Sequence, residues 1–295
     1  MTKKRTKKQF SVVMLILGII LLLHAISFLV PLGWSVLTSL KGKLEFRTNM
    51  FGLPKNWLFS NYSTVWKTFF IPVEAGATTR RVFMTEMLIN SILYAVGSAL
   101  VQTTVQFVMA YVSTRFKYKY GAFIYALVIF TLAFPLIGNN ASGLALATRL
   151  GLVDNILGMY LMKAYFLGMY FLVFYAQLKA FPKDFDEAAA IDGAGNFTIM
   201  WKIMFPMVVN TFFTIALLLF IGYWNDYTTP MLYMPNKPTL AYGLYYFSDL
   251  NRIASVSTTP MKLAACVMLM APILVIFLIF HNRLIGNISI GGLKE

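Results

Sequence analysis

Long runs of apolar residues without charge constrain the fold of this chain more than any other feature. Of its 295 residues, 59% are hydrophobic and only 12% are charged, a composition outside the range of ordinary soluble domains. An uncharged apolar run of about 20 residues is long enough to cross the hydrocarbon core of a bilayer as a helix. The sequence therefore predicts a polytopic membrane protein.

We expect an all-α fold with six transmembrane helices. The predicted spans are residues 10–32, 88–113, 122–137, 158–178, 207–227 and 263–280. A basic start followed by an apolar run is also typical of a signal peptide. The first run is too long for a signal peptide, and bulky residues follow it in place of a small-residue cleavage site. We therefore expect residues 10–32 to remain as an anchor.

The Lys and Arg residues predict which loops face the cytoplasm, because positive charges gather on that side of the membrane. Residues 1–9 and 115–120 are basic, which places the N-terminus inside; six spans then place the C-terminal tail, residues 282–295, inside as well. Residues 33–86 are expected outside the cell, although they carry Lys41, Lys43, Arg47, Lys55, Lys67, Arg80 and Arg81. Longer loops follow the charge rule less strictly. Residues 87–281 form the transmembrane core, including a cytoplasmic loop at residues 182–206.

Aromatic residues recur at helical spacing in the outside segment. Tyr62, Trp66, Phe69 and Phe70 fit one face of a short helix. Aromatic rings of membrane proteins concentrate at the headgroup level, so this face fits a helix packed on the membrane surface. A docking surface for an outside partner is the alternative.

The loop at residues 182–206 has its own helical pattern. Pro182 ends the fourth span, and Asp184, Asp186 and Glu187 then suit the first turn of a new helix, where acids oppose the helix dipole. The alanines that follow favour a helix with little bulk, and Gly193 allows a sharp turn. The sequence predicts a short helix, a bend and a second short helix that leads to Pro206.

Polar residues on two spans are candidates for a transport pathway or its gate. Ser91, Ser98, Gln102 and Gln106 are spaced by seven, four and four residues and share one helix face. A second group follows at the outer end of the fifth span, where Asp226 is expected to stay solvated: Tyr223, Asn225, Asp226 and Tyr227. Contacts with neighbouring helices are the alternative role for both groups.

Metal, catalytic and nucleic-acid sites are not expected. Cys266 is the one cysteine, and His24 and His281 are isolated in or beside apolar runs, so no ligand set or acid–base pair forms a pattern. No phosphate-binding glycine loop occurs. No basic stripe interleaved with aromatic residues lies outside the predicted spans, so nucleic acid is not an expected partner.

The spacing of the 182–206 loop resembles that of permease subunits of ABC importers. The family pattern is Glu-Ala-Ala, three residues, Gly, nine residues, Ile, one residue and Leu-Pro. This chain has Glu187, Ala188, Ala189, Gly193, Ile203 and Pro206 at those positions, with Asp192 before the glycine and Phe205 in place of Leu. Every fixed position but one therefore matches.

Further motifs resemble the carbohydrate branch of this family, which includes the second permease of the maltose transporter. The matching segments are Asn61-Tyr62, Asn90-Ser91, Trp224-Asn225-Asp226-Tyr227 and an ending around Gly291, Gly292 and Lys294. The ending matches more loosely, because its last residue is Glu295 where Gly is usual.

The resemblance implies a multi-pass subunit in the plasma membrane of a bacterium, forming half of a pathway for a sugar or oligosaccharide. Implied partners are a second homologous permease, two ATPase subunits that hold ATP and Mg²⁺, and an extracytoplasmic solute-binding protein. This chain would bind no cofactor and catalyse nothing. The loop helix would sit in a cleft on an ATPase through Glu187, and the ending would reach between the two ATPases.

Two alternatives remain open at this point. One is an ABC importer for a non-sugar solute such as an amino acid or polyamine. The other is a secondary carrier, which usually carries ionisable residues at the bilayer midplane and internal repeats. The predicted spans are almost free of charge, apart from His24 and Lys163 near their ends, which argues against a carrier.

Overall fold

The computed structural model describes residues 12–76, 78–116, 120–134, 138, 140–249 and 258–288, with backbone alone at 75, 248, 249 and 280–288. The chain divides into two compact units. The first unit comprises Met1–Thr68 and Asn251–Met268, and the second comprises Phe69–Leu250 and Leu269–Glu295. Each unit is mostly helical, as expected for a membrane protein.

The first unit holds α1 (Val12–Ser39), α2 (Lys43–Thr48), α3 (Ser60–Thr68) and the start of α14 (Thr259–Ile288). Along α1 the apolar side chains are exposed, and none of its most apolar 18-residue window is buried inside the protein. The end of α1 is fixed to α3, because Asn61 Nδ2 donates to the carbonyls of Ser39 at 2.7 Å and Lys41 at 2.9 Å. The helix α1 therefore has a long apolar stretch that the described chain leaves uncovered and one end that is fixed to α3.

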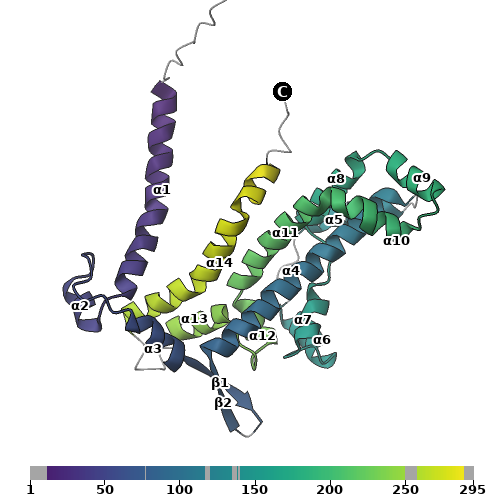
Figure 1. Cartoon of the computed structure of the whole chain (residues 1–295). Helices are drawn as coiled ribbons and strands as arrows, with labels where there is room; N and C mark the ends of the chain where they lie inside the picture. Colours follow the sequence, from purple (N-terminus) through teal and green to yellow (C-terminus); the bar gives the residue numbers. More distant parts are fainter. Residues whose placement is uncertain are drawn as a thin grey trace, which may run out of the picture. The chain divides into compact units, whose positions relative to one another are not determined.

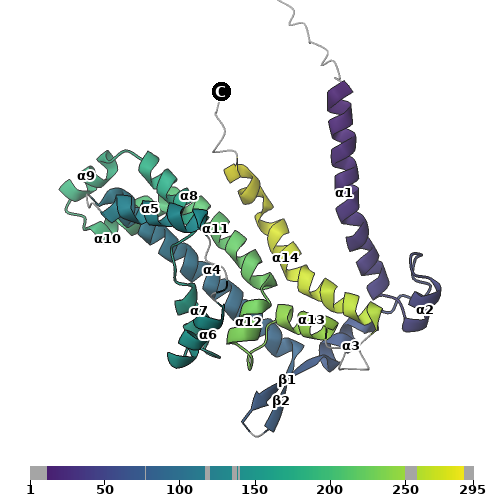
Figure 2. The ribbon, with the colours of Figure 1, turned by 180° about the vertical axis from the view of Figure 1, so that it is seen from behind.

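The second unit begins with an antiparallel hairpin of β1 (Phe70–Ala75) and β2 (Thr78–Phe83), in which Phe70 pairs with Phe83. The hairpin leads directly into α4 (Met84–Arg115), and it projects from that end of α4 in both views (Figures 1 and 2). The inward side chains Ile71 and Val82 are buried.

Within the second unit, α4 is the central helix. Against it pack α5 (Tyr120–Ala133), α7 (Ile156–Lys163), α8 (Met169–Ala180), α11 (Phe205–Asn225) and α13 (Leu240–Asp249), while α6 (Asn140–Arg149) and α12 (Thr228–Tyr233) pack against each other. The core of the half near Arg115 is aromatic: the Phe107 ring lies 5.6–6.4 Å from those of Phe174, Phe205 and Phe212. Such edge-on and tilted contacts stabilise a core beyond the area that they bury.

Four helices are long and apolar enough to cross a membrane: Val12–Ser39, Met84–Arg115, Asn196–Asn225 and Thr259–Ile279. They coincide with the first, second, fifth and sixth predicted spans. The third predicted span corresponds to the shorter apolar helix Tyr120–Ala133. The mostly helical membrane fold is therefore confirmed, and the exact number of crossings is not set by helix length alone.

The fourth predicted span, residues 158–178, is wrong as a single helix. The helix α7 ends at Lys163, and α8 begins at Met169. Gly168 stands between them with φ 153°, a conformation that only glycine adopts readily. The apolar composition continues through the break, which is why the sequence pattern did not reveal it.

Two expectations for residues 33–86 also need correction. The all-α prediction missed the hairpin. The aromatic face predicted for one helix is wrong at its last two members, because α3 ends at Thr68. Phe69 is buried against Phe247, with ring centroids 5.0 Å apart, and Phe70 belongs to β1.

The close approach at the start of α7 gives a test of this packing. A methyl group at Gly158 would lie 2.5 Å from the carbonyl oxygen of Leu152, so Gly158→Ala should destabilise the subunit by about 1–3 kcal/mol. A lower melting temperature in detergent would measure this loss. Gly222→Ala is the matched control, because a methyl group there meets no atom within 4 Å among the described residues. Equal melting temperatures for the two variants would contradict the packing.

Candidate functional site

The segment between α8 and α11 folds as the sequence predicted. Pro182 follows α8, and α9 (Asp184–Ile191) then carries three acids in its first turn. Gly193 has φ 82°, and the next amide, that of Ala194, donates to the carbonyl of Ala189 at 2.9 Å. This left-handed glycine ends the helix and satisfies a terminal carbonyl.

The return from this bend contains a feature that the sequence did not predict. A short α10 (Asn196–Thr198) passes into a π-helical turn, η1 (Ile199–Met204), before α11. The whole of Asn196–Asn225 is one continuous helical stretch of 30 residues. Ile203, in η1, and Pro206, in the first turn of α11, therefore belong to this one helical stretch.

The outer surface of α9 and α10 is unusually apolar for an exposed segment. Ile191 is 86% exposed and Phe197 is 73% exposed, and Phe185 is exposed as well. Glu187, Ala188 and Asp192 are also exposed, whereas Ala189 is buried. The segment therefore presents small and apolar side chains beside exposed carboxylates, a surface suited to contact with another protein.

The inner side of α9 is fixed by Arg115, the last residue of α4. Its guanidinium lies 2.9 Å from Asp186 Oδ2, and only 5% of the Arg115 side chain is exposed. The same guanidinium donates to the carbonyls of Leu178 at 2.8 Å and Pro182 at 3.4 Å. One side chain therefore joins the ends of α4, α8 and α9.

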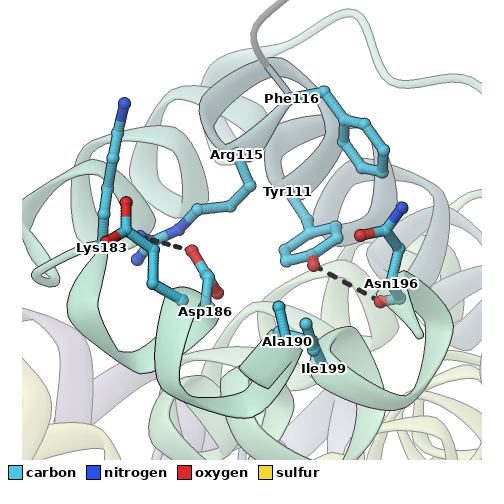
Figure 3. A pocket seen from close by; sticks show the side chains of 9 residues that line it. Tyr111, Arg115, Phe116, Lys183, Asp186, Ala190, Asn196 and Ile199 are labelled. Atoms are coloured by element: carbon cyan, nitrogen blue, oxygen red, sulfur yellow. Dashed lines mark hydrogen bonds and ion pairs between the residues drawn. The ribbon is translucent and has the colours of Figure 1, made fainter. Parts of the chain in front are cut away.

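A cavity of about 220 Å³ lies behind α9, lined by Tyr111, Arg115, Phe116, Lys183, Asp186, Glu187, Ala190, Asn196 and Ile199 (Figure 3). Tyr111 Oη donates to the carbonyl of Asn196 at 3.4 Å, which links α4 to α10 as well. Burial raises the pKa of Asp186 above its usual range, although the charge of Arg115 opposes this shift. The charge of Arg115 therefore offsets only part of the cost of burying the Asp186 carboxylate. Loss of the ion pair should destabilise residues 182–206.

The polar face predicted on α4 lies inside the subunit. Ser91, Ser98, Gln102 and Gln106 are all buried. Ser91 Oγ accepts from the amide of Leu240 at 2.8 Å, and Gln102 Oε1 accepts from the hydroxyl of Tyr223. Among the described residues, these groups contact helices of their own chain.

The group at the end of α11 is divided between buried and exposed side chains. Tyr223 is buried, whereas Asn225 and Tyr227 are exposed. The ring of Tyr227 stacks on that of Tyr245, with centroids 4.5 Å apart. Exposed amide and stacked aromatic groups of this kind suit contact with a polar solute or with a second subunit.

Asp226 is only partly solvated, and both of its carboxylate oxygens accept hydrogen bonds within the chain. Its Oδ2 accepts from Tyr94 Oη at 2.8 Å, and its Oδ1 accepts from the amide of Thr229 at 3.0 Å. The carboxylate is partly buried and caps the start of α12. Its partner on α4 lies 132 residues away in the sequence, which no local pattern could reveal.

Lys163 lies beside Tyr223, a member of the group at the end of α11. The sequence predicts this lysine near the end of a span, and the break after α7 brings its ammonium to 5.0 Å from the ring centroid of Tyr223. No hydrogen-bond acceptor of this ammonium is found in the part of the chain that the structure describes. An ionisable residue inside a predicted span was the signal that could have identified it.

The third group of predicted site residues, Gly291, Gly292 and Lys294, lies outside the described residues.

Comparison with known proteins identifies the family. Residues 106–289 match the binding-protein-dependent transport system inner membrane component family. The chain belongs to this family. It is thus a permease component of a multi-pass membrane transport system that depends on a binding protein, and ATP hydrolysis belongs to partner subunits. Membership removes the secondary carrier as an alternative.

Relatives cover nearly the whole chain. The diacetylchitobiose uptake system permease of Streptomyces coelicolor is 26% identical over 93% of this chain and 87% of its own length. A probable starch degradation products transport permease of Thermoanaerobacterium thermosulfurigenes is 30% identical over 95% of both chains. A solved bacterial ABC transporter involved in alginate import has the same fold, with a TM-score of 0.78 at 21% identity, over 94% of this chain and 99% of that chain.

The ion pair behind α9 should stabilise the whole segment. Asp186→Asn removes one charge at nearly constant shape and leaves the guanidinium of Arg115 less compensated, so it should cost about 2 kcal/mol. Faster proteolysis within residues 182–206, with a lower melting temperature, would measure this cost. Asp184→Asn, which changes an exposed acid in the same turn, should change neither; an equal effect of both variants would contradict a specific role for the pair.

Proposed function

We propose that this chain forms half of the membrane pathway of an ATP-driven importer for a sugar or oligosaccharide. The proposal rests on the relatives, two of which are described as permeases for diacetylchitobiose and for starch degradation products. In this proposal a second homologous permease completes the pathway, and an extracytoplasmic binding protein delivers the solute. Two ATPase subunits hold ATP and Mg²⁺, and this chain binds no cofactor.

The segment α9–α10 is the proposed contact with an ATPase. The observation that carries this proposal is a short exposed helix whose inner side is fixed by Arg115 and whose outer side leaves Phe185, Ile191 and Phe197 uncovered. Ala188 adds no bulk to that surface, and Glu187 can form a charge-assisted hydrogen bond with a basic group of the ATPase. Asp192 and Gly193 end the helix at the required bend.

In the proposed topology, the six crossings are α1, α4, α5, α7 with α8, α11 and α14. An irregular backbone is tolerated at membrane depth only where protein or a water-filled cavity surrounds it, so residues 164–168 would face protein or the pathway. The contact with an ATPase places residues 182–206 in the cytoplasm, and both termini then lie on that side. The ending with Gly291, Gly292 and Lys294 would reach the ATPases there.

The proposed pathway or outer gate includes the exposed residues at the end of α11. Asn225 and Tyr227 face away from the chain's own core, whereas Ser91, Gln102, Gln106 and Tyr223 would support them from inside. Asp226 would fix the turn between α11 and α12 through Tyr94 and Thr229.

The ATPase contact can be tested at Glu187. Glu187→Lys should abolish stimulation of ATP hydrolysis by loaded binding protein, because a basic partner would then meet a like charge, while membrane levels of the subunit stay normal. Gly193→Val should act similarly, because valine is strained at φ 82°. Asp184→Lys, an exposed change in the same helix, is the control. Normal uptake by Glu187→Lys would refute the assignment.

The pathway can be tested by thiol labelling after Cys266→Ser. The cysteines introduced by Asn225→Cys and Tyr227→Cys should react with a small polar reagent at rates that change with ATP or with loaded binding protein. Those from Gln102→Cys and Gln106→Cys should stay unreactive, because both positions are buried within the subunit. If the first pair never reacts in any state, these residues belong to helix packing instead.

A further inference from the structure

The segment from Gly42 to Phe59, between α1 and α3, leaves large apolar side chains uncovered. Phe51 is 80% exposed and Leu44 is 75% exposed, and Leu53, Trp57 and Phe59 are also more than half exposed. Five such side chains occur within 18 residues, more than the single exposed apolar residues that are normal at a protein surface, and we call them the apolar patch. Some other phase or molecule is needed to cover this patch.

The exposure does not reflect a loose segment, because hydrogen bonds from three side chains hold the backbone here. Lys41 is only 1% exposed, and its ammonium donates to the carbonyls of Asn49 at 2.8 Å and Met50 at 3.1 Å. Trp34 Nε1 also donates to the carbonyl of Met50, and Asn49 closes the next turn through the amide of Gly52. The fold therefore directs the apolar side chains outward.

Chain connectivity places this segment at the membrane surface. The candidate membrane span α1 ends at Ser39, and α2 begins at Lys43, so three intervening residues hold α2 within about 14 Å of the end of α1. The far end of the segment returns to the same place, because the amide of Leu58 donates to the carbonyl of Leu40 at 2.8 Å. Both views show α2 beside this end of α1 (Figures 1 and 2).

A basic cavity lies in the same unit. It measures about 210 Å³ and is lined by Lys43, Phe46, Arg47, Thr258, Thr259 and Pro260. Lys43 and Arg47 stand four residues apart on α2, so they share a face, and the two threonines add hydroxyl donors. No carboxylate is among these described lining residues. Two cations with two hydroxyls are the chemistry that binds a phosphate oxygen.

We propose that residues 42–59 form an interfacial anchor that binds an anionic phospholipid. The headgroup phosphate occupies the cavity between Lys43 and Arg47, and the side chains of Leu44, Phe51, Leu53, Trp57 and Phe59 enter the boundary between headgroups and acyl chains. Amphipathic segments with cations beside aromatic and aliphatic residues bind membrane surfaces in this way. The leaflet is the one that the C-terminal end of α1 reaches, so the proposal depends neither on the orientation of the chain nor on its solute.

Lipid fits this surface better than a protein partner does. The patch continues from α1, whose apolar window is entirely uncovered by the protein, and the membrane that covers α1 extends to the patch without another molecule. The cations at its edge complement the anionic charge of phospholipid headgroups. A partner permease or a binding protein on this surface is an outcome that the test separates.

Depth measurement tests the apolar patch. The full chain with Cys266→Ser would carry a spin label at Phe51→Cys and be reconstituted in nanodiscs of phosphatidylglycerol and phosphatidylcholine. The label should collide readily with oxygen and be shielded from a water-soluble nickel complex. A label at Ser63→Cys, an exposed position on α3 in the same unit, should show the opposite. Nickel access at Phe51 that is lost only when partner subunits or binding protein are added would assign the surface to protein and overturn the proposal.

Retention of lipid tests the cavity. Lys43→Gln combined with Arg47→Gln should lower the affinity for phosphatidylglycerol roughly tenfold, since each cation near an anionic surface contributes to binding. Native mass spectrometry of the full chain, titrated with phosphatidylglycerol against phosphatidylcholine, measures this change. Lys43→Arg should retain the lipid, and Lys67→Gln with Arg81→Gln, which removes two exposed cations elsewhere, should leave retention unchanged. Unchanged retention in the Lys43 and Arg47 double variant, or an equal loss in the control pair, would overturn the proposal.

Discussion

The guanidinium of Arg115 is the interaction on which the arrangement of the second unit depends at the end of α4. It closes α4 with a positive charge, which the helix dipole favours, and it also satisfies the terminal carbonyl of α8 at Leu178 and the carboxylate of Asp186 on α9. Only arginine offers several donors in one rigid plane to three acceptors at once. Because the side chain is almost fully buried, these bonds act in a medium that screens them weakly. A displacement of α9 is therefore resisted at α4 and α8, and the exposed loop behaves as part of the helical core.

Farther along α4, hydrogen bonds from its polar side chains hold the neighbouring segments in place. The hydroxyl of Tyr94 binds Asp226 at the start of α12, Gln102 binds Tyr223 on α11, and Ser91 binds the amide of Leu240 at the start of α13. Each bond joins segments more than 100 residues apart, and each removes a polar group that would be costly in an apolar surrounding. Helices in lipid gain little from hydrophobic burial against one another, so polar contacts and close packing determine their register. The polar face of α4 is therefore necessary for the fold whatever its further role in transport.

The sequence predicted the features that depend on local chemistry. The spans with strong apolar character are present, because an uncharged run of sufficient length can form only a helix in lipid. The helix, bend and helix of residues 184–204 follow from acids, alanines and Gly193 at close spacing, and that spacing also indicated the family. The hairpin at Phe70–Phe83 was missed because its evidence lies in pairing between two short segments. The positions of Asp226 and Arg115 were missed for a related reason, since their partners lie far away in the sequence and carry no periodic signal.

The break between α7 and α8 determines where the Lys163 side chain lies. A continuous helix through residues 158–178 would carry its polar and apolar groups with a single period. The interruption instead ends α7 at Lys163, where a cation is favoured by the helix dipole, and places that ammonium over the ring of Tyr223. The ring of Tyr223 is buried, and its hydroxyl donates to Gln102 Oε1. The broken helix thus places a cation beside Tyr223 near the end of α11, because the backbone at Gly168 interrupts a helix that would otherwise continue.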